Sequence, residues 1–513
     1  MSTTGEVEIT ILDNAGAANI VTAAPSVVAI FGVSSAGTPN VPVSTRSIAT
    51  LTSTFGYGPL TELGALLISQ GATVIATKLA QSSAGTASTV VGEQGTSAWT
   101  TTLDATVGAF DTYFVQIVVL SGGTVGAASA KMQIQVSLDA GRTFGPIQVV
   151  DISMATPTYT IPNTGITINV GAGTVDPSTA TSPVRFGTKE PQPGVGNIQA
   201  ALTALANSVY AQSGWGSVII HAPAFTGAMT TANVNTIQST LDTMATNQLF
   251  DRAMVNVRDA DLAASPWGGA GTESDATYTT TLAGLASSRN AKRLLAAAGF
   301  YNIPSGIANS VAGTPRYRRP GSWAIQARKV AVAVQTLSSR VKDGPLSTII
   351  VDTTSDPTDG FVYHDERINP GLDAVGYASF WTRLQQGSGF FVRSENLFSP
   401  PGSDFDLFAV GQCFDNFCST LVQYFTASID ESVRTNANGT IYENDAQQLE
   451  SGALAAVAAA MPGQYQAANT SVVIDRSYNV MTNKKALVTG VFGQLGYIRE
   501  FDLTVQLQNP LAS

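Results

Sequence analysis

The residues whose side chains are best suited to catalysis or metal binding lie at positions 364–366, where one imidazole and two carboxylates are adjacent. His364, Asp365 and Glu366 are residue types that bind metal ions or exchange protons with a substrate. His221 is the only other histidine, so a site with two imidazoles would require distant positions to meet. Neighbouring residues on an extended chain also point to opposite faces. We therefore expect a solvated loop here rather than a metal or acid–base centre.

A second candidate is a single Asp-box pattern, S-x-D-x-G-x-T-F. Its members are Ser137, Asp139, Gly141, Thr143 and Phe144. In this pattern the Asp and Ser or Thr side chains bond local backbone groups and stabilise a β-hairpin turn. Asp-boxes recur in sialidases and other glycan-active proteins, but there they come as several repeats that lie away from the catalytic residues. A single copy favours a structural turn, and a glycan-binding or glycan-cleaving particle-surface protein stays open as the alternative.

Cys413 and Cys418 are the only cysteines, and they lie five positions apart on a predicted helix. This spacing separates them around the helix axis, so buried packing thiols are expected rather than metal ligands. Two cysteines indicate no disulfide framework, which fits a reducing cytoplasm. The patterns G-x-x-x-x-G-K-[ST], G-x-S-x-G and H-E-x-x-H do not occur. We expect no catalytic residue, no metal and no cofactor, and an enzyme is disfavoured.

The composition is that of a large chain with little charge. With 513 residues the chain exceeds what one hydrophobic core supports, so several domains are expected. Only 12% of its residues are charged, which suits a surface covered by other chains, although a low-charge secreted protein would look similar. The net charge of −10 argues against a nucleic-acid-binding surface. Because the chain also shows neither signal-peptide layout nor a bilayer-length apolar run, we expect a soluble protein made in the cytoplasm.

Both ends of the chain have the period-two pattern of a strand with one apolar face. The apolar members are Val7, Ile9 and Ile11 at the N-terminus and Phe501, Leu503, Val505 and Leu507 at the C-terminus. An isolated strand is unstable in water, so each end must pair with a sheet. Two options stay open, namely edge strands of their own domain or arms donated to the sheet of a neighbouring subunit. Burying the four C-terminal side chains would contribute on the order of 6–12 kcal/mol before the entropy of ordering is subtracted.

Between the two arms the patterns predict an α/β protein (α+β overall) of several domains. The predicted regions are an N-terminal arm 1–24 (donor strand 6–12), a first part of the core α/β domain 25–83, an inserted β-rich domain 84–193, a second α/β domain 194–345, a C-terminal part of the core domain 346–495 and a C-terminal arm 496–513. Short apolar runs between Gly and Pro turns favour a β-sandwich-like insertion. Alternating strand and helix signals after it predict a mostly parallel sheet covered by helices.

The helix boundaries can be predicted at several points. A long amphipathic helix is expected over residues 406–430, because its apolar residues recur at spacings of three and four. The next helix is predicted to begin at a capping box formed by Asn444 and Gln447. Ser47 and Ser322 are expected to cap two earlier helices, the second of them running through residues 323–337. The last β segments are predicted at residues 471–475, 485–492 and 497–507.

Several blocks occur in a fixed order along the second half of the chain. They are Tyr363–Pro370 (YHDERINP) with Gly371–Leu372, Gly402–Phe405 (GSDF), Val473–Val480 (VIDRSYNV) and Leu495–Glu500 (LGYIRE). Together with VVAIFG, Arg46–Ser47, Phe55–Gly56 and QGATVIATKL nearer the N-terminus, they make the sequence resemble a contractile-tail sheath protein of myophages, most closely the Mu-like branch. The resemblance covers about half of the chain and does not extend to residues 84–193.

This resemblance implies a structural subunit that polymerises helically around a tail tube and contracts to drive the tube through the host envelope. It implies a core domain nearest the tube, an inserted domain facing outward, and two arms donated to neighbouring subunits. The implied partners are other copies of the chain, the tail tube protein, and the baseplate and tail terminator proteins, without direct nucleic-acid contact or stable membrane insertion. The implied location is the virion tail, after synthesis in the host bacterial cytoplasm. A bacteriocin or secretion-system sheath would share the mechanism and stays open.

Overall fold

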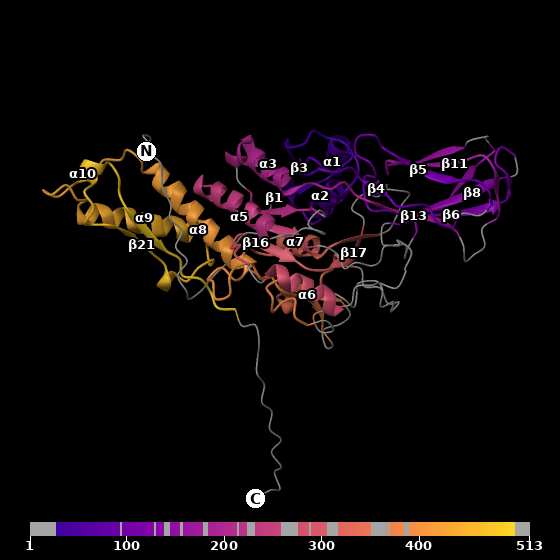
Figure 1. Ribbon diagram of the computed structural model, residues 1–513. Coiled ribbons are helices and arrows are strands. Elements are labelled where there is room, and N and C mark those ends of the chain that lie inside the picture. Colours follow the sequence, from indigo (N-terminus) through magenta and orange to yellow (C-terminus); the bar gives the residue numbers. More distant parts are fainter. Residues whose placement is uncertain are drawn as a thin grey trace, which may run out of the picture.

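The structure is a computed structural model that describes residues 27–92, 95–127, 130–137, 144–153, 157–177, 183–212, 215–222, 231–257, 275–286, 289–304, 316–349, 366, 370–383 and 389–497. The described chain is elongated (Figure 1). A β-rich region lies at one end, a central body of sheet and helices follows, and a smaller lobe built on α8, α9 and β21 lies at the other end. The predicted multidomain α/β class is confirmed.

A six-stranded sheet forms the central body, in the order β16-β15-β14-β1-β3-β2. Its strands are β1 (Val27–Gly32), β2 (Pro42–Thr45), β3 (Thr73–Lys78), β14 (Ser217–Ile220), β15 (Ala253–Asn256) and β16 (Leu294–Ala297). All neighbours in this sheet are parallel except β2, which runs antiparallel to β3 at the edge. The prediction of a mostly parallel sheet is therefore confirmed.

Helices cover both faces of this sheet. The helices α3 (Val195–Ala206), α5 (Thr231–Thr246) and α6 (Asp275–Ala286) contribute to one hydrophobic core, and α1 (Ile48–Phe55), α2 (Pro59–Ser69) and α7 (Gly321–Ala331) contribute to the other. In β1, Ala29 and Phe31 belong to the first core, while Val28 and Ile30 belong to the second. Successive strand residues point to opposite faces, so a strand covered on both sides is apolar throughout rather than alternating.

The β-rich region spans β4 to β13 and has a core of its own. Its five-stranded sheet has the order β4 (Thr86–Ala87), β13 (Val184–Lys189), β6 (Phe114–Ser121), β8 (Lys131–Ser137), β9 (Gln148–Asp151), and its three-stranded sheet has the order β10 (Thr158–Ile161), β11 (Ile166–Val170), β5 (Trp99–Leu103). A short pair joins β7 (Gly123–Thr124) to β12 (Thr174–Val175). Side chains such as Val115, Ile117 and Phe186 are completely buried between these sheets. A predominantly β region was expected here.

Two antiparallel ribbons extend the central body, namely β17 (Phe300–Pro304) with β18 (Arg316–Pro320) and β19 (Ser379–Thr382) with β20 (Phe390–Ser394). The C-terminal lobe is defined here as the second half of α8 (Phe408–Ala427) with α9 (Glu443–Ala460), β21 (Ser471–Ile474), α10 (Val480–Asn483) and β22 (Val488–Val491). Short 3-10 helices span Val209–Gln212, Val341–Asp343 and Ala467–Asn469. Among the described helices, none is both long and apolar enough to cross a membrane.

Two predicted helix caps are wrong. Helix α7 begins at Gly321 with Pro320 at its N-cap position, so Ser322 lies inside the helix, which ends at Ala331 because Val332 is extended. Helix α9 begins at Glu443 without a side-chain cap.

The other cap positions show why. In α9, Asn444 lies inside the helix and Gln447 donates to the Glu443 carboxylate (2.7 Å) instead of closing a capping box. The cap at Ser47 is confirmed, since its hydroxyl accepts the N–H of Thr50 at 3.3 Å. A cap motif is thus decided by the local backbone path, which spacing alone does not give.

Candidate functional site: an incomplete sheet in the C-terminal lobe

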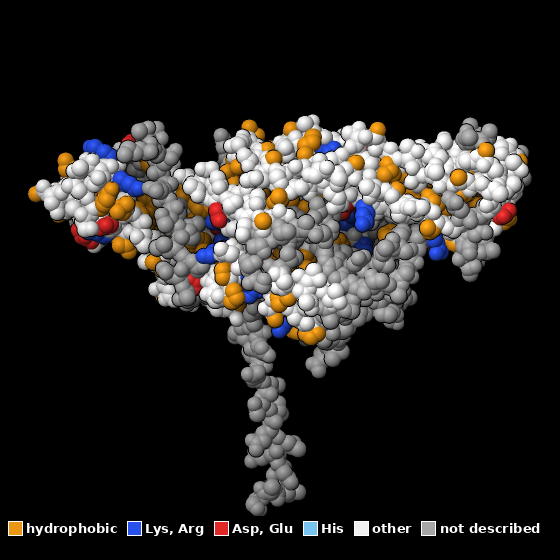
Figure 2. Space-filling view, in the orientation of Figure 1, with side chains coloured by type: hydrophobic (Ala, Val, Ile, Leu, Met, Phe, Trp, Pro, Cys, Tyr) orange, Lys and Arg blue, Asp and Glu red, His pale blue; other side chains and the backbone are white. Residues whose placement is uncertain are grey.

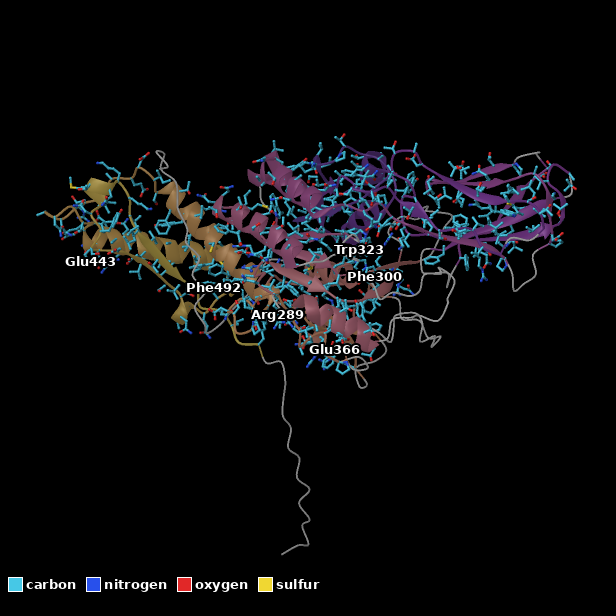
Figure 3. The ribbon with its side chains drawn as sticks, in the orientation of Figure 1. Arg289, Phe300, Trp323, Glu366, Glu443 and Phe492 are labelled. Carbon is cyan, nitrogen blue, oxygen red and sulfur yellow. The ribbon has the colours of Figure 1, made fainter. Side chains whose placement is uncertain are left out.

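The residues considered for catalysis are not assembled into a site. His364 and Asp365 lie outside the described residues. Glu366 lies in the central body (Figure 3), where its carboxylate accepts the N–H of Gly371 at 2.7 Å and burial raises its pKa. His221 is buried elsewhere, with its Nε2 3.1 Å from a Glu190 carboxylate oxygen. In the part of the chain that the structure describes, no three His, Cys, Asp or Glu side chains are arranged to hold a metal ion.

The other chemical candidates are structural where they are described. Cys413 and Cys418 are free, buried thiols on α8, and burial raises the pKa of both, to about 12 for Cys413. They are therefore packing residues, as expected. Of the Asp-box, Asp139, Gly141 and Thr143 lie outside the described residues. The flanking strands β8 and β9 are antiparallel neighbours, and the N–H of Gly145 donates to the carbonyl of Val136 at 2.8 Å across their connection.

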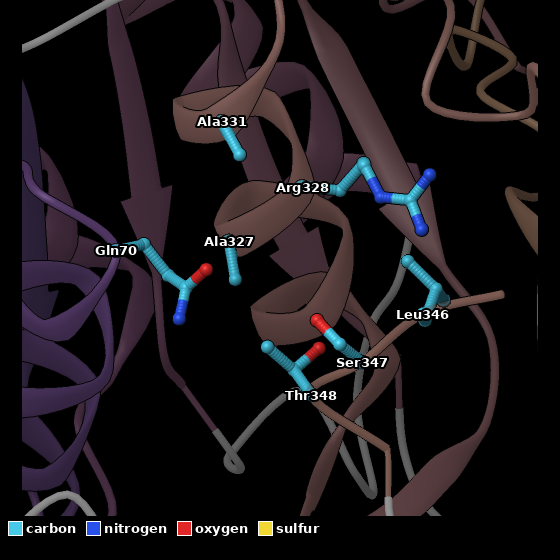
Figure 4. A pocket seen from close by; sticks show the side chains of 7 residues that line it. All are labelled: Gln70, Ala327, Arg328, Ala331, Leu346, Ser347 and Thr348. Carbon is cyan, nitrogen blue, oxygen red and sulfur yellow. The ribbon is translucent and has the colours of Figure 1, made fainter. Parts of the chain in front are cut away.

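A small pocket beside α7 offers no room for a substrate (Figure 4). Its volume is about 30 Å³, which is enough for about one water molecule. Gln70 and Arg328 line it, and the Arg328 guanidinium donates to the carbonyls of Gly344 and Pro345 at 3.0 and 2.6 Å. The arginine is thus used to hold the following loop against the helix.

Buried charges fix the first half of α8 to the central body. The Asp415 carboxylate on α8 lies 2.9 Å from Arg252 Nε and 3.1 Å from Arg293 Nη1. Arg252 directly precedes β15, and Arg293 directly precedes β16. Glu395 accepts the N–H of Ala409 in the first turn of α8 at 2.9 Å, which suits a carboxylate at the positive end of a helix. The carboxylate also accepts the N–H and the hydroxyl of Ser338 at 2.8 and 2.6 Å, and it lies 3.7 Å from the buried ammonium of Lys329. The helix is therefore held at one end and extends from the body into the lobe (Figure 1).

In the lobe, α8 and α9 support a sheet that has two strands among the described residues. On the inner face Val472 and Ile474 of β21 are buried, and Val472 joins Phe417 and Leu421 of α8 in a small core. Gly490 of β22 lies over α8 so closely that a Cβ there would approach Leu421 Cδ1 to 3.0 Å. In contrast to the central sheet, the outer face has no covering layer among the described elements, and Val473 is 50% exposed.

The hydrogen bonds of this pair show which backbone groups point outward. The N–H of Asp475 donates to the carbonyl of Leu487 at 2.8 Å. Bonded and non-bonded positions alternate along an antiparallel pair, so the register assigns Ile474 and its partner Val488 to a non-bonded position. By the same alternation Gly490 is non-bonded toward β21. The N–H and C=O groups of Val488 and Gly490 therefore point away from β21, toward the open side of β22.

The two edges of the pair differ. On the β21 edge, the outward N–H of Ile474 donates to Glu450 Oε1 at 2.6 Å, and the Glu450 carboxylate is also bound by Arg476. This ion pair lowers the pKa of Glu450, so the carboxylate that blocks the edge is charged near neutral pH. No described strand pairs with the other edge, along β22. All four residues of β22 are exposed.

Several exposed hydrophobic side chains belong to the two strands of this sheet and to the segment that connects them. Of the large hydrophobic residues that are exposed in the described chain, those between Ser471 and Val491 are Val473 (50%), Met481 (57%), Leu487 (37%), Val488 (36%) and Val491 (50%). Figure 2 shows hydrophobic side chains on the surface of this lobe, between the charged groups. Unpaired edges with apolar side chains readily add a further strand, and a two-stranded sheet is only marginally stable by itself. The site can therefore bind an extended segment through main-chain hydrogen bonds.

All residues predicted for the arms, namely Val7, Ile9, Ile11, Phe501, Leu503, Val505 and Leu507, lie outside the described residues. The last described residue, Tyr497, donates its hydroxyl hydrogen to the carbonyl of Gln335 at 2.8 Å. The C-terminal arm thus leaves from a point fixed on the central body.

Fold and site together define a multidomain α/β protein whose last sheet is incomplete. No protein-family model matches the sequence, and no curated protein matches it. Two solved structures of sheath tail proteins align with most of the chain. The one from Listeria innocua is 12% identical, with 94% of this chain and 94% of that chain covered and a TM-score of 0.43. The one from Desulfitobacterium hafniense is 11% identical, with 95% and 100% covered and a TM-score of 0.43.

Proposed function

We propose that the chain is the structural subunit of a contractile tail sheath, of the type found in Mu-like myophages. The observation that carries this proposal is the open edge of β22 in a chain that also has a strand-forming sequence at each end. Each copy then offers an acceptor and supplies donors. The ordered sequence blocks that resemble sheath proteins, from YHDERINP to LGYIRE, support the same function.

The polymer follows from the type of contact. The acceptor edge and the donated arms are different surfaces. When each copy donates to one neighbour and accepts from another, each contact is heterologous and leaves a free acceptor or donor at either end. Heterologous contacts that do not close into a ring produce an open helical filament. The apolar residues of the C-terminal arm would bury their side chains on the lobe, while the backbone groups of Val488 and Gly490 would bond the arm's main chain.

The remaining assignments extend this proposal. The central body would face the tail tube, and the β-rich region, with proposed bounds 84–193, would face outward. Contraction would be a change between two packings of the same subunits, during which the arms keep neighbours connected. The tube protein, the baseplate and the tail terminator would be the other partners in the virion tail. A bacteriocin or secretion-system sheath would use the same contacts.

Removal of residues 499–513 tests the proposal. We expect the truncated chain to fold, since Tyr497 and its bond to Gln335 are kept, and to remain monomeric where the full chain forms tubes in electron micrographs. A matched pair of full-length variants controls for the deletion. Val505→Asp, on the apolar face of the arm, should abolish tubes, and Thr504→Asp, on the polar face, should not. Long tubes from the truncated chain or from Val505→Asp would contradict the proposal.

A further inference from the structure

A cationic aromatic surface lies on the ribbon of β19 and β20, away from the lobe. Phe380, Phe390 and Val392 point into the hydrophobic core beneath it. The opposite side of the ribbon carries the half-buried Trp381, Arg383 and Arg393, which are called here the arginine–tryptophan face, above Phe391, which is 3% exposed. Trp381 lies directly opposite Phe391 in the register. Arg383 follows Trp381 by two residues, and Arg393 follows Phe391 by two residues on the antiparallel strand. The two arginines therefore lie on the two sides of the indole.

The two guanidinium groups stack on the same indole. The Cζ atoms of Arg383 and Arg393 lie 4.1 and 4.2 Å from the centroid of the Trp381 ring. Stacking holds a guanidinium by cation–π attraction and leaves its N–H edges free for a carboxylate. It also fixes the side chain in advance, so that less entropy is lost when an anion binds. The face is therefore preorganised for anionic groups.

Its charge is only partly compensated. Arg393 lies 3.7 Å from Asp373, whereas Arg383 makes no ion pair with any described carboxylate. The Nε of Arg383 and the Nε1 of Trp381 are both shielded from solvent without a hydrogen-bond partner. Partial burial and the neighbouring Arg393 lower the pKa of Arg383. The chain has a net charge of −10, so this face is a local excess of positive charge, and it can bind an anionic group.

A complementary anionic feature lies at the far end of α8. The helix ends at Ala427 with no basic residue in its last turn, and Asp430 and Glu431 follow it as exposed residues. Neither carboxylate makes an ion pair with a described residue. Negative charge at the carboxyl end of a helix is unfavourable, because the unpaired carbonyls there already carry partial negative charge. A groove of about 570 Å³ beside Glu431, lined by Tyr424 and other residues, gives space for a partner's side chains.

We propose that the arginine–tryptophan face of one subunit binds the Asp430–Glu431 end of α8 in a second copy of this chain. This inference rests on the proposed function, because it supplies a second heterologous contact between neighbouring subunits. The two surfaces lie in different parts of the molecule. The ribbon is tied to the central body by Glu366, whose N–H donates to Phe380 at 2.8 Å, whereas the other end of α8 lies in the lobe (Figure 3). When each copy binds one neighbour through the arginine–tryptophan face and a different neighbour through the end of α8, the contacts are heterologous and repeated pairing extends a polymer.

Charge reversal tests the pairing. Arg383→Glu and Glu431→Arg should each raise the protein concentration needed for tube formation by about tenfold or more, and the double variant should restore assembly. Lys342→Glu, an exposed reversal elsewhere on the central body, is the matched control and should have little effect. Thermal unfolding of Arg383→Glu and Arg383→Gln establishes that the fold is retained.

The outcomes separate this inference from the proposed function. Tubes that form from Arg383→Glu at the wild-type concentration would overturn the pairing but leave the sheath subunit intact. Loss of assembly that Glu431→Arg does not restore would also overturn it, and would assign the arginines to another acidic partner such as the tube. If the wild-type chain forms no tubes, sedimentation equilibrium of the full-length chain decides. Salt-sensitive self-association that both reversals weaken and the double variant restores supports the pairing, and its absence refutes it.

Discussion

The central sheet and the sheet of the C-terminal lobe differ in completeness. The central sheet has six strands with helices on both faces, and residues such as Val28 and Phe31 are fully buried. In the described part of the chain, the lobe sheet has two strands, one covered face and one edge without a partner strand. Both are made of short apolar segments in the same chain. The stability of a strand thus depends on its neighbours, and no described strand neighbours β22 on its open side.

The charges differ in the same direction. In the central body Asp415 joins two buried arginines, and Glu395 and Lys329 have no solvent exposure. In the lobe the ion pairs of Arg476 and Arg434 lie at the surface. Breaking a buried pair leaves an uncompensated charge, whereas an exposed pair is replaced by water at little cost. Breaking an ion pair should therefore cost more free energy in the body than in the lobe.

The largest expected effect follows from closing the open edge. The substitution Val488→Pro removes the N–H that points away from β21, so the lobe should still fold. An added strand would lose a hydrogen-bond donor and would clash with the proline ring. We expect tube formation to require at least about tenfold more protein, as measured by pelleting and microscopy.

Two variants control this prediction. Val488→Ala keeps the N–H and should assemble almost normally. Thr489→Pro removes an N–H that points toward β21 and should instead destabilise the lobe itself, as seen by thermal unfolding. Normal tubes from Val488→Pro would show that this edge accepts no strand.

A large effect on stability is expected in the central body. Asp415→Ala leaves Arg252 and Arg293 buried without their shared carboxylate, which should lower the free energy of unfolding by about 3–5 kcal/mol. Asp242→Ala is the matched control, because it also pairs with Arg293 (3.2 Å) but its side chain is 56% exposed; its effect should be about 1 kcal/mol or less. Chemical denaturation measures both. Equal effects would remove the contrast between buried and exposed pairs.

Acid should affect the lobe and the body in opposite directions. Arg476 lowers the pKa of Glu450 below its ordinary value of 4.5, so this carboxylate stabilises the lobe above that pH and the contribution is lost as the pH falls through the lower folded-state pKa. Burial raises the pKa of Asp251 in the body well above 3.8, so protonation there relieves a penalty. Brief pepsin digestion between pH 4.5 and 2.5 should therefore cut first in the lobe.

The substitution Glu450→Gln should flatten this pH dependence in the lobe and leave that of the body unchanged. Cleavage that begins in the body at the same pH would contradict the assignment.

The smallest effect concerns the thiols of α8. Because burial raises the pKa of Cys413 and Cys418, neither should react with a thiol reagent at pH 8 until the chain unfolds. Both should react at once in denaturant. Rapid labelling of Cys418 alone in the native protein would indicate that the lobe opens independently of the body.

The local elements could be predicted closely where a single period dominates. The helix expected over residues 406–430 is α8 (Phe408–Ala427), and Ser47 caps its helix as expected. The caps at Ser322 and Asn444 were wrong, because Pro320 and Tyr442 set the backbone path at those helix starts. The predicted arms lie outside the described residues and stay predictions. The acceptor could not be predicted, since the segments 471–475 and 485–492 showed only that strands form, and not how many would pair.

What the sequence by itself determined is the class of each segment, because hydrophobic period and turn residues act over a few neighbouring positions. It determined the alternation of strand and helix in the body, and it predicts strands at both ends. The tertiary structure decided which strands have neighbours, that Asp415 meets Arg252 and Arg293, and that Trp381 lies between two arginines. These are contacts between residues far apart along the chain, and no local pattern encodes them. For the same reason, no local pattern predicts that one edge of β22 lacks a partner among the described strands.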